Sequence, residues 1–262
     1  MKSIVFKEKK IFYDLSGKGK TVVLLHGFTE THKVWDFFIK KLSENYQVLA
    51  IDLPGHGKSE TVAEVHTMEL MADVVQKVLK HCSVRKCIMF GHSMGGFITL
   101  AFAEKYPNML RGIGLLNSHA FEDSPEGKNN RDRTIDLVKA DKFSYMSQFI
   151  PQLIAEKNRE KLKKKIDKLV RKANEMNPEG IIAAQAGMKL RPSRLQVLAD
   201  AKVPVLFVIG LQDTRMPVDR AWEMIRQPKV SSTLVLRDVA HIASLEAPKE
   251  TLRAVRTFLK SI

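Results

Sequence analysis

The sequence predicts an α/β protein in which a mostly parallel sheet is flanked by helices and carries an inserted helical cap. Short apolar runs of strand length alternate with amphipathic stretches of helix length, the pattern of parallel strands joined by crossover helices. The alternation stops between residues 118 and 194, where the chain is charged and favours helix. We therefore expect an α/β core made of residues 1–117 and 195–262, with residues 118–194 inserted as a cap, or lid.

The expected strands are short apolar runs bounded by polar or glycine-containing turns. Residues 3–14 are expected to form an antiparallel entry hairpin. The other expected strands are Thr21–Leu25, Gln47–Ile51, Lys86–Phe90, Gly112–Leu116, Val203–Ile209 and Thr233–Leu236. Helices are expected at Met68–His81, where apolar residues recur at helical spacing, at residues 95–106 and at about Pro248–Leu259. In open α/β sheets the ligand binds outside the carboxyl ends of the strands, where the cap would lie.

The composition is that of a globular protein without a membrane segment. The 262 residues are 44% hydrophobic and 27% charged, and the longest apolar runs are far shorter than a bilayer span. Residues 1–8 carry no apolar signal region and are expected to form a strand instead. The two cysteines, Cys82 and Cys87, are expected to be free thiols in a reducing compartment. We therefore expect a cytoplasmic protein.

The formal net charge of +14 is high, and basic residues are densest between residues 157 and 172. Such a run favours an anionic partner or substrate. The alternative is a solvated helix face on which Glu156, Glu160 and Asp167 form pairs with basic neighbours one turn away. No nucleic-acid-binding motif accompanies the run and it contains no aromatic residue, so we expect no nucleic-acid partner.

The most informative motif is Gly-His-Ser-Met-Gly at residues 91–95, directly after an apolar strand and directly before a helix. A serine held on a sharp strand-to-helix turn is typical of a nucleophile elbow. Such a turn strains the backbone of Ser93 and leaves no room for side chains two residues away, which explains glycine at both 91 and 95. The serine hydroxyl would then stand above the sheet, at the positive end of the helix.

A serine hydroxyl needs a base to take its proton, and that base must be oriented by an acid. Asp213 follows the strand that ends at about Ile209, and His241 follows the next strand. Both positions lie at the same edge of the sheet as Ser93, so the three side chains can converge. We therefore predict a catalytic triad of Ser93, Asp213 and His241, in the chain order Ser, Asp, His.

The predicted reaction also needs hydrogen-bond donors for the oxyanion of the tetrahedral intermediate. The backbone N–H groups of Phe28 and Met94 are the candidates, and glycine at position 27 would let its loop approach the substrate oxygen. The cap is expected to set specificity, although apolar residues at helical spacing usually pack a core. The candidate substrate-binding residues, in the cap and beside the nucleophile, are Gly27, His92, His119, Phe143, Met146 and Met188.

Together these elements resemble the α/β-hydrolase fold, and within it the capped, esterase-like serine hydrolases. The resemblance rests on His26-Gly27-Phe28, the turn at residues 52–59, residues 91–96, residues 210–213, His241 and the Leu-Glu-Ala-Pro at 245–248. It implies that the turn at 52–59 packs beside the oxyanion loop, so that His56 is structural. It also implies hydrolysis of a carboxylic ester, thioester or lactone of a small to medium acyl substrate through an acyl-enzyme, with neither a cofactor nor a metal.

Other activities of the same family stay open. Dehalogenases and epoxide hydrolases of this fold carry an aspartate where this chain has Ser93, which argues against both. Carbon–carbon bond hydrolases often carry a tryptophan after the catalytic histidine, where this chain has Ile242, so that activity is disfavoured but not excluded. Haloperoxidase-like members share the pattern. A carrier-protein methyl ester esterase, whose acidic carrier would dock on the basic cap, and a ligand-binding receptor of the same fold are further alternatives.

Overall fold

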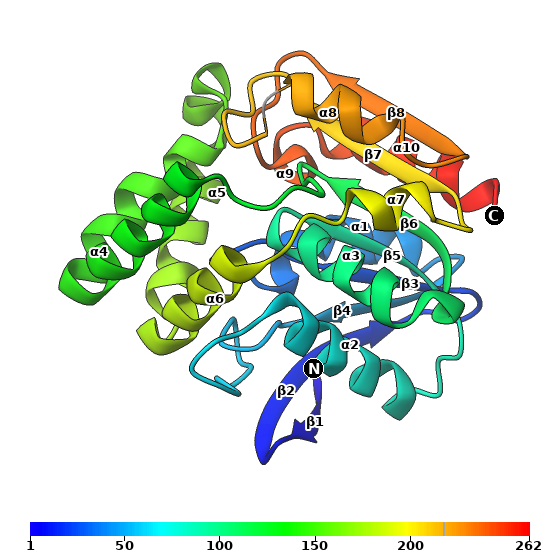
Figure 1. Ribbon diagram of the computed structural model, residues 1–262, viewed down its shortest axis with the longest axis horizontal. Helices are drawn as coiled ribbons and strands as arrows, with labels where there is room; N and C mark the ends of the chain where they lie inside the picture. Colours follow the sequence, from blue (N-terminus) through cyan, green and yellow to red (C-terminus); the bar gives the residue numbers. More distant parts are fainter. Residues whose placement is uncertain (217) are drawn as a thin grey trace.

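Apart from residue 217, the computed structural model describes the whole chain. The described residues form a sheet of eight strands in the order β1-β2-β4-β3-β5-β6-β7-β8 (Figure 1). The strands are β1 (Lys2–Phe6), β2 (Lys9–Ser16), β3 (Thr21–Leu25), β4 (Gln47–Ile51), β5 (Cys87–His92), β6 (Leu110–Leu116), β7 (Val205–Gly210) and β8 (Ser231–Leu236). β1 pairs antiparallel with β2, and β2 with β4, whereas the remaining neighbours are parallel. The fold class is therefore the predicted one.

Helices cover both faces of the sheet, because the central parallel strands are apolar on both faces. In β3, Val22 and Leu24 pack into one apolar layer, and Val23 and Leu25 pack into the other, as the alternation of strand side chains requires. The first layer contains η1 (His32–Trp35), α1 (Asp36–Leu42), α9 (Ala243–Glu246) and α10 (Pro248–Lys260). The second contains α2 (Met68–His81), α3 (Met94–Lys105), α7 (Leu195–Ala199) and α8 (Val218–Ile225).

The predicted elements agree with the observed ones wherever the apolar pattern is regular. β3, β4 and α2 have the predicted bounds, and the other predicted strands and helices differ by one or two residues at an end. The sequence predicts none of the short helices α1, α7, α8 and α9. Each is about two turns long or shorter, so its apolar face offers too few repeats for the helical period to stand out.

The segment between β6 and β7 is helical, without a strand. It contains α4 (Pro125–Phe149), η3 (Ile150–Leu153), α5 (Glu156–Asn174) and α6 (Pro178–Leu190), which lie together at one end of the sheet (Figure 1). Ser124 caps α4 by accepting the Gly127 N–H, and Asn177 caps α6 by accepting the Glu179 N–H. α4 is broken at Asp141, whose backbone angles of φ −154° and ψ 87° are not helical. We call residues 118–194 the helical insertion.

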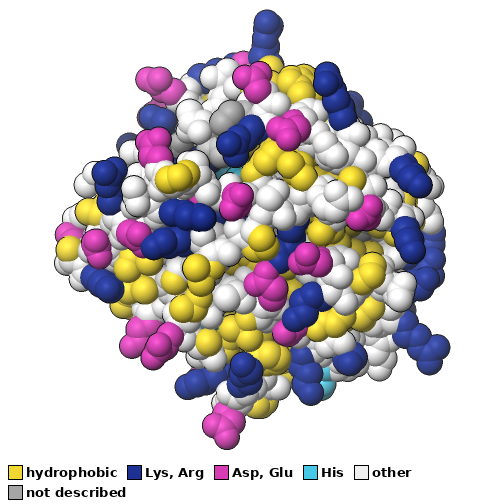
Figure 2. Space-filling model, viewed as in Figure 1, with side chains coloured by type: hydrophobic (Ala, Val, Ile, Leu, Met, Phe, Trp, Pro, Cys, Tyr) yellow, Lys and Arg dark blue, Asp and Glu magenta, His cyan; other side chains and the backbone are white. Residues whose placement is uncertain are grey.

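The high positive charge is spread over the surface. Figure 2 shows Lys and Arg side chains scattered over the visible face and interleaved with Asp and Glu. The basic run lies on α5, whose buried face is apolar. Within the described chain, Glu156, Glu160 and Asp167 form no ion pair, so the predicted pairing along this helix is absent. The ion pairs made by the basic run are Lys172–Glu175 and Lys157–Asp238, which leaves most of its charge unpaired.

No helix of the described residues is both long enough and apolar enough to cross a bilayer. Cys82 and Cys87 are free thiols, and Cys87 is buried in β5. Burial raises the pKa of the Cys87 thiol to about 12, so this group stays protonated and unreactive at neutral pH.

Candidate active site

The turn between β5 and α3 has the strained geometry expected of a nucleophile elbow. Ser93 has φ +49° and ψ −115°, in the left-handed half of backbone space, where a side chain is rarely found. A Cβ at Gly91 would lie 2.1 Å from the Gly95 carbonyl oxygen, and a Cβ at Gly95 would lie 2.4 Å from the Leu25 carbonyl oxygen. Neither position has room for a Cβ atom, so glycine is required at both, as predicted from the sequence.

The three residues of the predicted triad lie in one hydrogen-bonded chain. The Ser93 hydroxyl lies 2.8 Å from His241 Nε2, and His241 Nδ1 lies 2.8 Å from Asp213 Oδ2. Asp213 and His241 stand on the loops after β7 and β8, at the same sheet edge as the elbow. This geometry lets Nδ1 donate to the carboxylate while Nε2 accepts the serine proton.

The carboxylate of Asp213 is held in its charged form. Burial alone would raise its pKa, but the charge and hydrogen bond of His241 outweigh burial and lower it. The Arg215 backbone N–H adds a 2.9 Å hydrogen bond to Oδ1, and the Asn117 amide adds one of 3.2 Å to Oδ2. An ionised Asp213 can therefore orient the imidazole and stabilise its cation.

Asn117 ties the aspartate loop to the histidine loop, a role that the sequence analysis missed. It directly follows β6 and has φ +46°. Its side-chain amide donates to Asp213 Oδ2 and to the Ala240 carbonyl oxygen at 2.8 Å, and its Oδ1 accepts the Ala243 N–H at 3.2 Å. The sequence signal that could have identified this role is a polar residue placed directly after the carboxyl end of a predicted strand.

The two candidate oxyanion donors are free in the described structure. Among the described residues, no turn or loop hydrogen bond uses the backbone N–H of Phe28 or of Met94. Met94 is the first residue of α3, so its N–H also has no partner within the helix. Both amides therefore remain available to an oxygen bound above Ser93.

Gly27 has a different role from the predicted one. A Cβ at this position would lie 2.7 Å from His92 Nδ1 and 3.0 Å from Glu30 Oε2, so the glycine makes room for these two side chains. Gly27 is not among the residues that line the cavity beside Ser93. Its contribution is a 2.7 Å hydrogen bond from its N–H to Glu30 Oε2, which fixes the start of the oxyanion loop.

His92 and Glu30 form a buried pair behind the triad. His92 Nδ1 lies 2.9 Å from Glu30 Oε2, and His92 Nε2 lies 2.6 Å from the His241 carbonyl oxygen. Both ring nitrogens face acceptors, so both must donate and the ring must carry a positive charge. Burial would lower the pKa of His92, but the Glu30 charge and hydrogen bonds outweigh it and raise the pKa, while the pKa of Glu30 is lowered. Although His92 borders the cavity, its polar atoms are engaged elsewhere, contrary to the predicted substrate contact.

The turn at residues 52–59 packs against the oxyanion loop, as the family resemblance implies. The Leu53 N–H donates to His26 Nε2 at 3.0 Å, and Asp52 Oδ1 accepts from His32 Nδ1 at 2.7 Å. His56 is fully buried, and burial lowers its pKa to about 3. It does not line the cavity, which agrees with a structural role.

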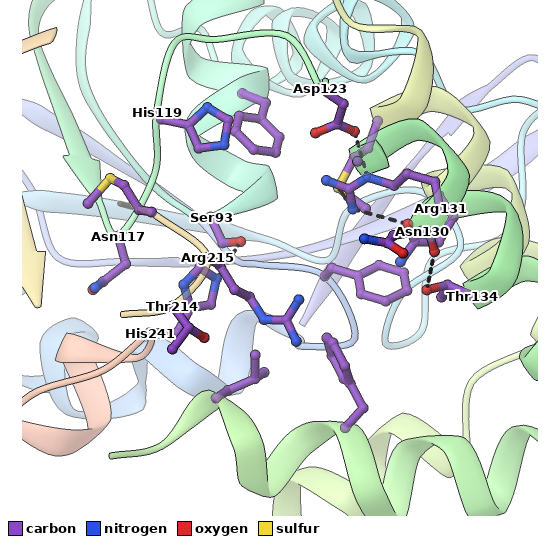
Figure 3. A pocket seen from close by; sticks show the side chains of 18 of the residues that line it. Ser93, Asn117, His119, Asp123, Asn130, Arg131, Thr134, Thr214, Arg215 and His241 are labelled. Carbon is purple, nitrogen blue, oxygen red and sulfur yellow. Dashed lines mark hydrogen bonds and ion pairs between the residues drawn. The ribbon is translucent and has the colours of Figure 1, made fainter. Parts of the chain in front are cut away.

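Ser93 and His241 border a cavity of about 570 Å³ between the sheet edge and the helical insertion (Figure 3). Aromatic side chains and two arginines, Arg131 and Arg215, contribute to its wall. The aromatic residues are Phe28, Phe97, Tyr145 and Phe149. Phe149 stacks on Tyr145, with ring centroids 5.2 Å apart, and meets Phe28 edge-on at 6.1 Å. The carboxyl groups of Glu30, Asp123 and Glu126 also line the cavity, so the wall combines apolar surface with charges of both signs.

Of the predicted cap contacts, His119 and Met188 line this cavity. His119 Nδ1 accepts the Phe121 N–H at 3.2 Å, and burial together with the Arg191 charge lowers its pKa to about 3. The ring is therefore neutral, with Nε2 carrying the proton.

Phe143 and Met146 do not line the cavity, contrary to the prediction. Phe143 is 65% exposed and borders a shallow groove beside α5, whereas Met146 is fully buried within the hydrophobic core. Tyr145 and Phe149, one helical turn apart, face the cavity instead. The helix is broken at Asp141, before all of these residues, so a helical period read from the start of α4 does not continue through them.

A family model described as the alpha/beta hydrolase fold matches residues 20–248. The chain belongs to the α/β-hydrolase fold family. This hydrolase is similar to a thermophilic esterase from Thermogutta terrifontis, solved with malate bound, with 31% identity, a TM-score of 0.92 and coverage of 97% of this chain and 94% of that one.

Two curated relatives of this hydrolase are named for two different reactions. The dihydrolipoyllysine-residue acetyltransferase component of an acetoin-cleaving system from Pseudomonas putida is 26% identical over 254 residues, 95% of this chain and 66% of that protein. This chain thus spans slightly less than two thirds of that relative. A pimeloyl-[acyl-carrier protein] methyl ester esterase from Proteus mirabilis is 35% identical over 105 residues, 40% of this chain and 39% of that one.

Proposed function

We propose that this hydrolase cleaves a carboxylic ester of a small to medium acyl substrate through an acyl-enzyme on Ser93, with thioesters and lactones as related substrates. The observation that carries the proposal is the unbroken hydrogen-bond chain from Ser93 through His241 to Asp213, beside a cavity of about 570 Å³. The similarity to an esterase at 31% identity over nearly the whole chain supports the same bond type.

In the proposed reaction the Ser93 hydroxyl gives its proton to His241 Nε2 while Oγ attacks the substrate carbonyl carbon. The backbone N–H groups of Phe28 and Met94 hold the resulting oxyanion. His241 then protonates the departing alcohol, and the acyl group stays on Ser93. Water, deprotonated by His241, attacks the acyl-enzyme and releases the acid. Asp213 keeps Nδ1 protonated throughout, and no cofactor or metal takes part.

We also propose that the core and the helical insertion have different roles in the reaction. Residues 1–117 and 195–262 supply the triad and the oxyanion donors, and residues 118–194 act as a cap whose cavity-facing side chains select the substrate. His119 and Met188 are the proposed cap contacts, because both line the cavity. We also propose a cytoplasmic location, which the two free thiols favour.

A carrier-protein ester is the second candidate substrate, since one observation favours it. Most basic side chains of α5 are exposed and have no carboxylate within ion-pair distance in the described structure. An acidic carrier protein could dock on this surface, and one relative is by name an esterase for a carrier-bound methyl ester. No particular contact among the described residues favours a carbon–carbon bond hydrolase or a ligand-binding receptor over an esterase.

The test compares Ser93→Ala with wild type on short-chain nitrophenyl esters, with exposed Ser232→Ala on β8 as the matched control. The proposal predicts a loss of several orders of magnitude in kcat for Ser93→Ala and wild-type rates for the control. Equal rates for wild type and Ser93→Ala would refute it. A carrier-bound ester whose turnover falls with salt, beside a neutral ester whose turnover does not, would support the second candidate.

A further inference from the structure

Arg215 stands in the candidate active site with a fixed backbone and a free guanidinium. Its backbone N–H donates to Asp213 Oδ1 at 2.9 Å, which anchors the residue beside the predicted triad. Its side chain extends into the cavity that Ser93 and His241 border (Figure 3). Nothing in the proposed ester cleavage uses this cation.

The Arg215 guanidinium lies over an aromatic ring, and none of its N–H groups donates a hydrogen bond to a described residue. Arg215 Cζ lies 4.6 Å from the centroid of Phe149, and Phe149 is itself held by stacking on Tyr145 and by contact with Phe28. A guanidinium whose N–H groups are unengaged can hold a carboxylate with two parallel hydrogen bonds. Its donors are thus available to an anion in the cavity.

No protein carboxylate neutralises Arg215 within the described residues. The neighbouring cavity arginine, Arg131, is paired with Asp123 at 2.8 Å, and Arg191 shares the same carboxylate at 2.6 Å. Arg215 forms no ion pair with any described acidic side chain, and its side chain is exposed to the open cavity. The remaining unpaired carboxylate of the cavity wall, Glu126, belongs to the exposed first turn of α4. Arg131 and His92 are each paired with a carboxylate, so Arg215 is the cavity cation that has no ion-pair partner among the described residues.

We propose that the substrate of this hydrolase carries a carboxylate in addition to the ester, and that Arg215 binds this carboxylate; the inference rests on the proposed ester hydrolysis. Arg131 on α4 lines the same cavity, but its pairing with Asp123 leaves Arg215 as the cation for the substrate. The neutral His119 ring and the Tyr145 hydroxyl add uncharged polar groups to the same cavity. The substrate class is thus a half-ester of a short dicarboxylic acid, or a close relative with the same two groups.

The kinetic test uses matched pairs of esters, monomethyl glutarate against methyl pentanoate, with acid release followed at constant pH. Wild type is expected to favour the anionic ester by about tenfold or more in kcat/KM, because a charge-assisted bidentate contact is lost with the neutral ester. In Arg215→Gln, the ratio of kcat/KM for monomethyl glutarate to kcat/KM for methyl pentanoate is expected to fall about tenfold. Arg215→Lys, which keeps the charge without the planar fork, should keep part of the preference.

Arg226→Gln is the matched control, because Arg226 is exposed, lines no part of this cavity and changes the net charge equally. Its anionic preference should equal that of wild type. The proposal is overturned if wild type shows no preference, if Arg215→Gln leaves the ratio unchanged, or if Arg226→Gln lowers it as much as Arg215→Gln.

A binding measurement separates this inference from the proposed catalysis. Calorimetry on Ser93→Ala should show glutarate binding more tightly than butyrate, and Arg215→Gln in the same background should abolish the difference. Equal binding of the two acids would overturn the carboxylate site even if esters are cleaved. If Ser93→Ala binds glutarate more tightly than butyrate but still cleaves esters at the wild-type rate, the carboxylate site stands and the proposed catalytic role of Ser93 is contradicted.

Discussion

Replacing His92 with alanine is expected to destabilise the fold by about 3–5 kcal/mol, the usual cost of removing one partner of a buried ion pair. His92 and Glu30 are only 2% and 3% exposed at their side chains, so solvent does not replace the lost partner. The variant loses the 2.9 Å bond to Glu30 and the 2.6 Å bond to the His241 carbonyl oxygen. Against a typical unfolding free energy of about 5–15 kcal/mol, this is a large fraction.

Urea unfolding of wild type, His92→Ala, Glu30→Gln and the double variant measures the effect as a double-mutant cycle. We expect the double variant to lose less than the sum of the single losses, with a coupling of about 1–3 kcal/mol, because each single variant already breaks the pair. The kcat of His92→Ala should also fall, since the loop that carries His241 loses a hydrogen bond. Additive losses, or a loss below about 1 kcal/mol for His92→Ala, would contradict the charged pair.

The pH dependence of the same pair has a definite sign. The pKa of His92 is raised above its ordinary 6.5, so its stabilisation is fully present below pH 6.5 and disappears as pH rises through the folded-state pKa. The pKa of Glu30 is lowered below 4.5, so its contribution is present above pH 4.5 and is lost as pH falls through the folded-state value. The stability difference between wild type and His92→Ala should therefore be largest between about pH 4.5 and 6.5. A difference that grows steadily above pH 7 would contradict this assignment.

Three further substitutions test other parts of the site. Asp213→Asn should lower kcat by up to about 10⁴-fold with little change in stability, because the neutral amide favours the wrong imidazole tautomer; a loss under tenfold in ester assays would argue against its role. Asn117→Ala should destabilise the protein by about 1–3 kcal/mol in urea unfolding and lower kcat, because three hydrogen bonds between the loops are lost; unchanged stability would contradict that link. Gly95→Ala should cost about 3 kcal/mol or more, since its Cβ would lie 2.4 Å from the Leu25 carbonyl oxygen; a variant as stable as wild type would show that the elbow relaxes.

The sequence was sufficient for the parts of the molecule that depend on local pattern. Continuous apolar runs predicted β3 and β4 with their observed bounds, because parallel strands buried on both faces need such runs. The elbow was predictable because its glycines are required within a few residues of Ser93. Asp213 and His241 were predictable because each follows a strand at the carboxyl edge of the sheet.

The sequence was insufficient where a role depends on two distant loops meeting. Glu30 lies 62 residues from His92 in the chain, and the bonds of Asn117 to Ala240 and Ala243 span still more, so no local pattern predicts either contact. Arg215 is one of many basic residues, and its lack of a partner appears only in the folded chain. In the helical insertion, the sequence makes Phe143 and Tyr145 equally suited to a pocket, but the folded chain places Tyr145 in the cavity wall and leaves Phe143 exposed.

The most direct test of the central claim is rapid-quench mass spectrometry of the wild-type enzyme during turnover of an activated ester, with peptide mapping. The proposed mechanism predicts a burst of about one equivalent of alcohol per active site and an acyl group attached to the peptide that contains Ser93. Steady turnover without any acylated Ser93, or acylation of another residue at the same rate, would contradict it.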